Sequence, residues 1–322
     1  MCRFNPHHFV RRLREVGGFD LHKAPQILPL GVPDLPLVVP LIDHRYRRVE
    51  ILTEPTVALP LYKVVNLRTG ELHVRSRREL QDRFRIREDA QVLLSGVGRD
   101  PVIERWWELP DQSKLLAELR RLGVSLITSP NYSVLNDVPR TDNLYAMKKI
   151  LLAWCEMMSA GVRTALHINA RTERDYERWA ELIRVRPEIE TIAFEFGTGC
   201  GRGDRIEWHV AQLTHLAQFV GRPLGLIVRG GGRKLLELRS AFEVTLLDTD
   251  GFSRTYRRRK AYFAPDGRLK WARFLTRPDE PLDELIAHNI SCVRAYYVAM
   301  ATLLQPAAVS AVSTDPLKHI AR

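Results

Sequence analysis

The sequence reads Thr-Ala-Leu-His-Ile-Asn-Ala over residues 164–170 and Thr-Ile-Ala-Phe-Glu-Phe-Gly over residues 191–197. Each segment has the pattern of a short strand that ends in polar side chains, and a helical pattern follows it. Because side chains alternate across a strand with a period of two, His167 and Asn169 share one face, and Glu195 lies on the corresponding face of the second segment. The other face of both segments carries large apolar residues. One face is therefore expected to pack on helices, while the other turns polar at the carboxyl end.

Two later segments repeat this pattern. They read Leu-Gly-Leu-Ile-Val-Arg-Gly-Gly over residues 224–231 and Glu-Val-Thr-Leu-Leu-Asp-Thr-Asp over residues 243–250. The alternation groups Arg229 with Gly225, and Asp248 with Leu246, on the face that turns polar. In parallel α/β proteins, functional sites form at the carboxyl ends of the strands. The sequence therefore predicts a site built from these four strand ends.

The regular rhythm of strand and helix begins at residue 91. Strands are expected at residues 92–95, 125–128, 164–169, 191–196, 224–229 and 244–248. Helices are expected between them, with Thr172 as the N-cap of a helix from Glu173 to Val185. With one or two further strands from the first third of the chain, this order predicts an α/β fold of the TIM type, a (β/α) barrel, regular or irregular. An open doubly wound sheet is the alternative.

Two segments flank this core. Residues 1–90 are expected to form an N-terminal extension packed on the barrel, with a hairpin from residues 61–66 and 71–75. Pro40 argues against a central strand at residues 37–42. The barrel core is expected to span residues 91–322 and to end in a basic hairpin, which turns at Pro265-Asp266-Gly267, and a long helix from Leu282 to Leu304.

Composition restricts the class of protein. The chain has 322 residues, is 45% hydrophobic and 27% charged, and carries a net charge of +11, which is typical of a globular protein with an anionic partner or substrate. An Arg-rich composition without such a partner is the alternative. The four cysteines are widely separated, so neither a metal site nor a disulfide framework is expected. No cofactor, signal peptide or membrane span is expected either, and these features fit the cytoplasm.

The strand ends provide candidates for catalysis and substrate binding. The carboxylates and the imidazole suit acid, base or nucleophile roles, and the glycines after the strand at residues 224–229 would let an anionic ligand approach the backbone. The alternatives are that these polar residues cap helices or pair with each other, and that the glycines form a turn. The catalytic candidates are Asp250, Asp248, Glu195 and His167, and the substrate-binding candidates are Asn131, Asn169, Arg229, Gly230, Gly231 and Arg233.

A basic run follows these candidates. It is interleaved with Tyr256, Tyr262 and Phe263. Cations can bind phosphates and aromatic rings can stack on bases, so the run is predicted to face a nucleic acid. A solvated hairpin kept soluble by its charge is the alternative. The basic residues are Arg254, Arg257, Arg258, Arg259 and Lys260.

The segment from Val244 to Trp271 resembles the catalytic stretch of the tRNA-guanine transglycosylases and the related DNA 7-deazaguanine transglycosylases, which are TIM barrels. The resemblance implies that Asp250, or else Asp248, is the carboxylate that attacks the ribosyl carbon and displaces a base. The chain lacks the family's cysteine-rich zinc site and its Asp-Ser-Gly-Gly-Phe strand end, which leaves the nucleic acid and the base open. The matching residues are Asp248, Asp250, Phe252, Arg254, Arg258, Phe263, Asp266 and Gly267.

These observations support three hypotheses. The first is a nucleic-acid-modifying enzyme that performs base exchange or N-glycosidic chemistry through a carboxylate nucleophile. The second is a non-catalytic nucleic-acid-binding protein of a phage or mobile element, in which the basic run binds the polymer and a partner protein can take part. The third is a TIM-barrel enzyme that acts on a small phosphorylated metabolite held near Gly230 and Arg233.

Overall fold

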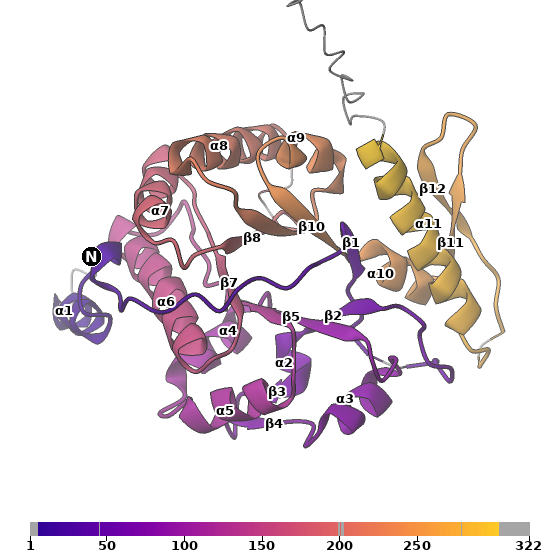
Figure 1. Ribbon diagram of the computed structural model, residues 1–322, viewed down its shortest axis with the longest axis horizontal. Helices are drawn as coiled ribbons and strands as arrows, with labels where there is room; N and C mark the ends of the chain where they lie inside the picture. Colours follow the sequence, from indigo (N-terminus) through magenta and orange to yellow (C-terminus); the bar gives the residue numbers. More distant parts are fainter. Residues whose placement is uncertain (1–5, 45, 199, 201–202, 278, 303–322) are drawn as a thin grey trace, which may run out of the picture.

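The structure, a computed structural model, describes residues 6–44, 46–198, 200, 203–277 and 279–302. Its centre is an eight-stranded parallel sheet with the order β1-β10-β9-β8-β7-β6-β5-β2, and a parallel bridge from Leu41 to Ala58 joins the two end strands. The strands therefore follow chain order around a nearly closed barrel (Figure 1). This confirms the TIM-type prediction over the open sheet. The strands are β1 (Val38–Pro40), β2 (Thr56–Pro60), β5 (Gln91–Ser95), β6 (Leu126–Thr128), β7 (Thr164–His167), β8 (Thr191–Glu195), β9 (Gly225–Arg229) and β10 (Glu243–Asp248).

Helices surround the barrel (Figure 1). The expected N-cap at Thr172 is present, because its side chain accepts from the N–H of Asp175, and the Asp175 side chain in turn binds the Thr172 N–H. This reciprocal capping box satisfies two backbone donors that the helix itself cannot pair. The helices are α1 (Pro6–Glu15), α2 (Leu61–Val64), α3 (Arg77–Phe84), α4 (Asp100–Glu108), α5 (Ser113–Arg121), α6 (Arg140–Ser159), α7 (Glu173–Val185), α8 (Arg205–Val220), α9 (Leu235–Arg239), α10 (Asp250–Tyr256) and α11 (Asp283–Thr302).

The interior of the barrel is lined by residues that every strand contributes. They form one buried cluster, so they meet across the barrel axis. Larger apolar side chains at the alternate positions belong to a separate cluster with the surrounding helices. In β7 and β8 small residues lie inside and bulky residues outside, and the interior faces of β7, β8 and β9 are those that were predicted. The interior residues are Val39, Leu41, Ala58, Leu93, Leu126, Ala165, Ala193, Ile227 and Leu247.

The hydrogen-bond ladder of the barrel is reduced to a single bridge between β1 and β2. The N–H of Leu41 donates to Asp248 of β10 at 2.8 Å, and the N–H of Ile42 donates to Ala58 of β2 at 2.8 Å. Because alternate residues of a parallel strand bond to opposite neighbours, residue 40 would donate towards β2. It is Pro40, which has no N–H. The proline thus shortens the ladder at this junction without excluding β1 from the barrel.

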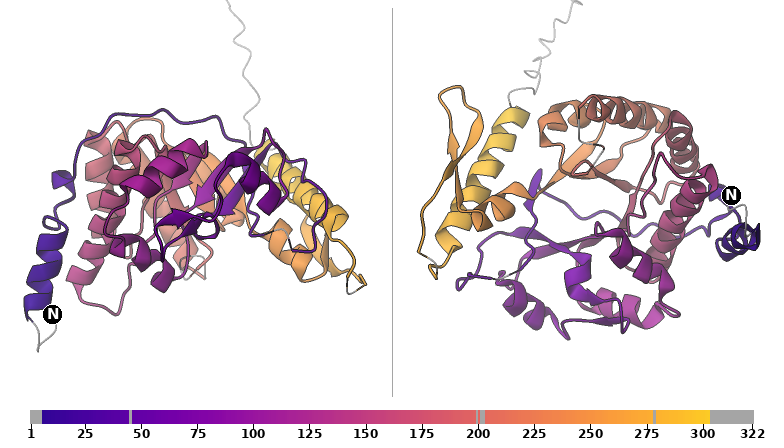
Figure 2. Two further views of the ribbon diagram at one scale, coloured as in Figure 1. Left: turned by 90° about the horizontal axis from the view of Figure 1, so that it is seen from below. Right: turned by 180° about the vertical axis from the view of Figure 1, so that it is seen from behind.

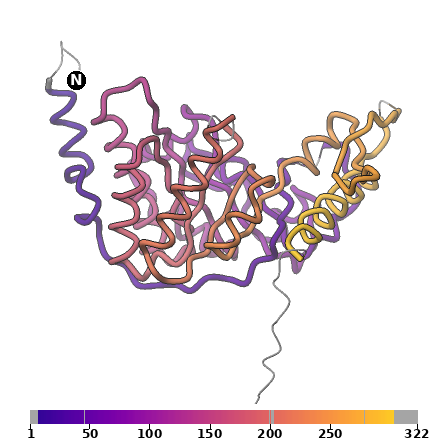
Figure 3. Tube along the Cα trace, turned by 90° about the horizontal axis from the view of Figure 1, so that it is seen from above, coloured from indigo at the N-terminus to yellow at the C-terminus, as the bar shows by residue number. Residues whose placement is uncertain are grey.

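The N-terminal third contributes to the barrel as well as covering it. β1 and β2 lie within the segment expected to be an extension, so the barrel begins at Val38 and not at residue 91. Before β1, the chain crosses the amino end of the barrel (Figures 1, 2 and 3). Its backbone accepts hydrogen bonds at Leu30 from Arg163 and at Asp34 from Gln91. Of the hairpin expected from residues 61–66 and 71–75, only β3 (Val65–Asn66) and β4 (Glu71–Leu72) pair, because residues 61–64 form the helix α2.

The C-terminal hairpin and helix lie beside the barrel, next to α10 (Figure 1). β11 (Arg259–Phe263) and β12 (Leu269–Arg273) pair antiparallel around the expected turn. The edge of β11 is bound by α11, where Asn289 accepts from the N–H of Ala261 at 2.8 Å and His288 contacts the Ala261 carbonyl at 2.8 Å. Within the described residues, no helix combines the length and the apolar character needed to cross a membrane.

Candidate active site at the carboxyl end of the barrel

A buried ion pair joins β8 and β9 inside the barrel. Glu195 and Arg229 are direct partners in the strand register, and Nη1 of Arg229 donates to Oε2 of Glu195 at 3.1 Å. The Glu195 side chain is 4% exposed, whereas that of Arg229 is 32% exposed. Burial raises the pKa of Glu195, although Arg229 and the N–H of Gly197 act in the opposite direction. The pair thus combines a buried carboxyl group of raised pKa with an arginine side chain that solvent partly reaches.

His167 lies on the same interior face, one strand away. It is paired in register with Ala193 of β8 and is 2% exposed. Burial lowers its pKa to about 3, and the charge of Arg229 adds to the effect. Its Nδ1 is buried without a hydrogen-bond partner among the described residues. This nitrogen is enclosed by protein atoms, and burying a polar atom without a partner is costly. The neutral imidazole therefore belongs to the wall of the site.

The two asparagines of the predicted site meet each other. Nδ2 of Asn169 donates to Oδ1 of Asn131 at 3.1 Å and to the carbonyl of Tyr132 at 3.1 Å. Asn169 is 8% exposed. Both amides therefore join the loops after β6 and β7, and this contact fixes the shape of the barrel mouth beside His167.

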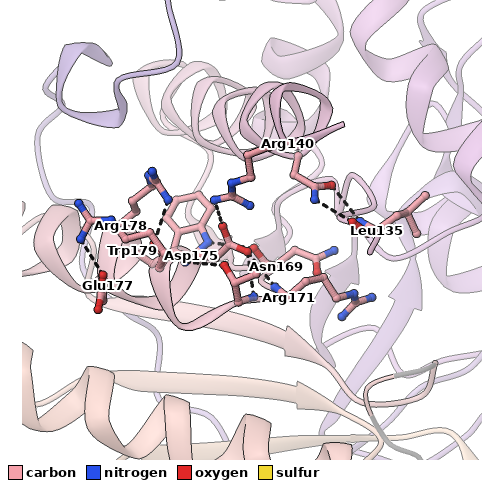
Figure 4. A network of polar contacts seen from close by, with 11 residues as sticks. Leu135, Arg140, Asn169, Arg171, Asp175, Glu177, Arg178 and Trp179 are labelled. Atoms are coloured by element: carbon pink, nitrogen blue, oxygen red, sulfur yellow. Dashed lines mark hydrogen bonds and ion pairs between the residues drawn. The ribbon is translucent and has the colours of Figure 1, made fainter. Parts of the chain in front are cut away.

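A second network of polar contacts joins the loop after β7 to the helices α6 and α7 (Figure 4). Trp179 donates to the carbonyl of Asn169 at 3.0 Å. Asp175 is fully buried, forms an ion pair with Arg140, and accepts from the N–H groups of Arg171 and Thr172 at 3.0 Å each. Because burial opposes ionisation while these donors outweigh it, the pKa of Asp175 lies below its usual range. The first turn of α7 is thereby locked to α6 and to the end of β7.

Asp248 differs from its predicted position. Leu246 packs in the outer cluster and Leu247 in the interior one, so Asp248 faces outward. Its carboxylate accepts from the N–H groups of Asp250 at 2.8 Å and Gly251 at 3.0 Å, at the start of α10. The prediction of a shared face with Arg229 was wrong because the two adjacent leucines give no size contrast that would identify the interior side.

Burial raises the pKa of Asp248. Its pKa is raised to about 6, even though the N–H groups of Asp250 and Gly251 stabilise the charged form. Asp250 is the first residue of α10, and its carboxylate, 53% exposed, pairs with Arg254 at 3.3 Å. Asp250 is therefore the more accessible of these two carboxylates.

The glycines after β9 form a tight turn beside the ion pair. Gly230 and Gly231 have φ values of +74° and +72°. A Cβ added to Gly230 would lie 2.8 Å from the backbone nitrogen of Gly197, and one added to Gly231 would lie 2.7 Å from the Phe196 ring. Glycine is required here both by conformation and by space. Arg233 follows within a 3-10 turn, Gly232–Lys234.

Sequence reasoning missed three polar groups at the same end. The Thr128 hydroxyl accepts from the N–H of Gly96 at 2.9 Å, and the Tyr62 hydroxyl donates to the Gly96 carbonyl at 3.0 Å. Ser95 is also buried at the end of β5. The patterns Leu93–Ser95 and Leu126–Thr128 repeat the change from apolar to polar seen in β7, so the alternation could have revealed Ser95 and Thr128. No sequence signal points to Tyr62.

The basic run divides between two elements. Arg254 lies on α10, with its guanidinium 5.6 Å from the centroid of the Trp271 ring, and Arg257 is the C-cap residue of that helix. Arg258 links α10 to β11 with a φ of +53°, and Arg259 and Lys260 begin β11.

The positive charge of the chain is concentrated in this region. Residues 254–277 contain nine Lys and Arg residues but a single carboxylate, that of Asp266, so these 24 residues carry a net charge of +8 out of +11 for the chain. Such a concentration argues against the alternative of a generally Arg-rich composition.

The described residues contain no group of three or more His, Cys, Asp and Glu side chains placed to hold a metal ion. A comparison with protein-family models finds none that matches the sequence, and a comparison with curated proteins finds no significant match. The roles proposed below therefore rest on the barrel fold and on the geometry at its carboxyl end.

Proposed function

We propose that this protein is an enzyme that modifies a nucleic acid, and that the reaction takes place at the carboxyl end of the barrel. The observation that carries the proposal is the interior pair of Glu195 and Arg229, because it combines a buried carboxyl group of raised pKa with a partly exposed cation. Titratable groups perturbed in this way are concentrated at functional sites. The concentration of positive charge beside the barrel supports a polyanionic substrate.

Each group has a distinct role in the proposal. Arg229 binds the anionic part of the substrate, since its guanidinium is the accessible member of the pair. Glu195 transfers a proton, because burial shifts its pKa upward and so favours the protonated form relative to an exposed glutamate. His167, one strand from Glu195 on the same interior face, is neutral and forms part of the wall beside the pair.

On the resemblance to the transglycosylases, we propose displacement of a base from its sugar as the reaction. Asp250, which the resemblance to the transglycosylases designates, attacks the sugar carbon, the carbon–nitrogen bond breaks, and the base leaves with a proton from Glu195. An incoming base or water then displaces the Asp250 carboxylate and returns a proton to Glu195. Two carboxyl groups that divide these roles are a recurring arrangement in the chemistry of glycosidic bonds.

The test uses nucleoside analysis. tRNA, single-stranded DNA and duplex DNA are incubated with the protein and a mixture of free purine bases, digested to nucleosides and examined by mass spectrometry. An altered nucleoside or a released base is expected with the wild type, and its loss is expected with Glu195→Gln. Unaltered nucleosides with all three polymers would refute the activity. Full turnover by Asp250→Asn would remove Asp250 from the reaction but leave Glu195 in it.

A small phosphorylated substrate is the second candidate, and the glycine turn favours it. Gly230 and Gly231 follow Arg229 directly and have positive φ values, and a tight glycine turn next to a cation suits a compact phosphate group. This candidate predicts that nucleoside monophosphates and sugar phosphates raise the melting temperature of the wild type but not of Arg229→Gln, whereas oligonucleotides have no effect.

A further inference from the structure

The hairpin of β11 and β12 has one face that is partly buried, at Ala261, Leu269 and Trp271, and one that is open. Phe263, at the end of the partly buried face, is 47% exposed. Ala261 is 1% exposed and its backbone is bound by α11. The opposite face is formed by Lys260, Tyr262, Lys270 and Ala272, and all four are exposed. We call these four residues the open face of the hairpin.

The open face places an aromatic ring between two cations. Tyr262 is directly opposite Lys270 in the antiparallel register, so their side chains are neighbours. Lys260 lies on the same face two residues earlier, about 7 Å along the strand. Its ammonium lies 5.3 Å from the centroid of the Phe274 ring, which gives it a defined position.

Carboxylates are scarce within the hairpin itself, although Lys260 also lines a pocket that contains acidic residues, among them Glu280 and Glu284. Asp266 is the single carboxylate between residues 254 and 277, and it pairs with Arg268 at the turn. Exposed cations close together on a small ribbon repel each other, and a bound polyanion relieves this repulsion. Tyr262 is 45% exposed, although an aromatic ring is usually sheltered.

We infer that the open face of the hairpin binds a single-stranded nucleic acid, with a base stacked on Tyr262 and phosphates bound by Lys260 and Lys270. A duplex offers phosphates but keeps its bases stacked inside, so it would use the two lysines and leave Tyr262 without a role. A single strand uses all three side chains, because every base has a face that can stack on an aromatic ring. This inference deepens the proposed function by naming the form of the nucleic acid, and it rests on that proposal only for the class of substrate.

Binding is measured by fluorescence anisotropy with the full chain and two labelled probes, a single-stranded DNA of mixed sequence and the same sequence as a duplex. We expect Tyr262→Ala to weaken single-strand binding roughly tenfold and Tyr262→Trp to preserve it, since stacking on one residue contributes that much. Duplex binding should change less than about twofold in both variants. Equal losses for both probes, or a Tyr262→Trp variant as weak as Tyr262→Ala, would overturn the inference.

The lysines are tested by the salt dependence. Lys260→Gln with Lys270→Gln should reduce the slope of log affinity against log salt by about 1.4 for the single strand, since each phosphate contact accounts for about 0.7. The matched control is Arg11→Gln with Arg14→Gln, two exposed cations on α1. An equal reduction in the control would show that net charge alone governs binding. Tyr262-dependent binding to vesicles of anionic lipid, without binding to either DNA, would replace the nucleic acid by a membrane surface.

The two proposals can fail separately. Glu195→Gln should bind the single strand as the wild type does, because the hairpin lies outside the barrel. Normal Tyr262-dependent binding without any altered nucleoside would reject the activity but keep the hairpin inference. Altered nucleosides together with binding independent of Tyr262 would reject the hairpin inference but keep the activity.

Discussion

Nη1 of Arg229 lies 3.1 Å from Oε2 of Glu195, across two adjacent strands of the barrel interior. The rest of the barrel interior is lined by Ala, Val, Leu and Ile side chains, and this pair introduces two charged groups there. Ion pairs in such surroundings seldom add net stability, because desolvation offsets the attraction. We therefore interpret the pair as a feature that serves the site and is tolerated by the fold.

Replacing Arg229 alone should reveal the desolvation cost of the Glu195 carboxylate. Arg229→Met is expected to lower the free energy of unfolding at pH 8 by about 2 kcal/mol, because it leaves a buried carboxylate without compensation. Adding Glu195→Gln to Arg229→Met should recover most of the loss, since the double variant buries no charge. Chemical denaturation of the wild type, Arg229→Met, Glu195→Gln and the double variant gives the double-mutant cycle.

The sign of the pH dependence provides an independent check of this prediction. Burial raises the pKa of Glu195 in the folded state, so the folded protein retains a proton that the unfolded chain releases. Stability from this group falls as pH rises above its unfolded pKa. Arg229→Met should raise the pKa of Glu195 further and therefore cost less at pH 5 than at pH 8. An equal cost at the two pH values would contradict this account.

Titration of Asp248 should make the stability of the fold depend on pH in a second range. Its folded pKa is about 6, above the usual value for aspartate, so stability from this group is expected to fall as pH rises from about 4 to about 6, by up to about 3 kcal/mol. Asp248→Asn keeps an oxygen to cap α10 but cannot titrate. Relative to the wild type, this variant should gain stability across that pH range. A constant difference between the two proteins would show that Asp248 is already ionised at pH 4.

The capping of α7 can be tested at Asp175. Asp175→Asn is expected to lower the free energy of unfolding by about 2 to 3 kcal/mol at pH 7, because it leaves Arg140 without its buried partner. The pKa of Asp175 is depressed, so its contribution is complete above the unfolded value and is lost as pH falls below about 4. The difference in the free energy of unfolding between Asp175→Asn and the wild type should therefore become smaller below about pH 4.

Glu177 provides a matched control for Asp175 on the same helix. It is exposed and pairs with Arg174 at 2.6 Å. Glu177→Gln should change stability by less than about 0.5 kcal/mol, since exposed ion pairs contribute little. Similar losses for the two variants would mean that burial of Asp175 has no special importance.

The sequence allowed the interior residues of three strands to be predicted because side-chain size alternates in β7 and β8, and because Gly225 and Arg229 mark one face of β9. Ala165 and Ala193 lie inside, whereas Leu166 and Phe194 lie outside. These patterns placed His167, Glu195 and Arg229 correctly. The contrast in size is absent from β10, where Leu246 and Leu247 are adjacent, and Asp248 was assigned to the wrong face.

Other features depend on contacts between distant segments. The pairing of Asn131 with Asn169, and the binding of Gly96 by Thr128 and Tyr62, leave no periodic signal. β1 was hard to recognise because it has three residues and ends in Pro40. Its membership in the barrel follows from its ladder with β10 and from the backbone donor of Ile42.

The glycine turn after β9 gives the last prediction. Gly230 and Gly267 have nearly the same φ, +74° and +76°, but a Cβ at Gly230 would lie 2.8 Å from the backbone of Gly197, whereas one at Gly267 would meet nothing within 4 Å. Gly267→Ala should cost about 1 kcal/mol, from the left-handed conformation alone. Gly230→Ala should cost about 3 kcal/mol or more, because overpacking against a backbone adds to it. Thermal and chemical denaturation of both variants would measure the difference, and equal costs would show that the turn can move away from Gly197. If the turn also positions Arg229, Gly230→Ala should weaken turnover of saturating substrate in the folded fraction more than Gly267→Ala does.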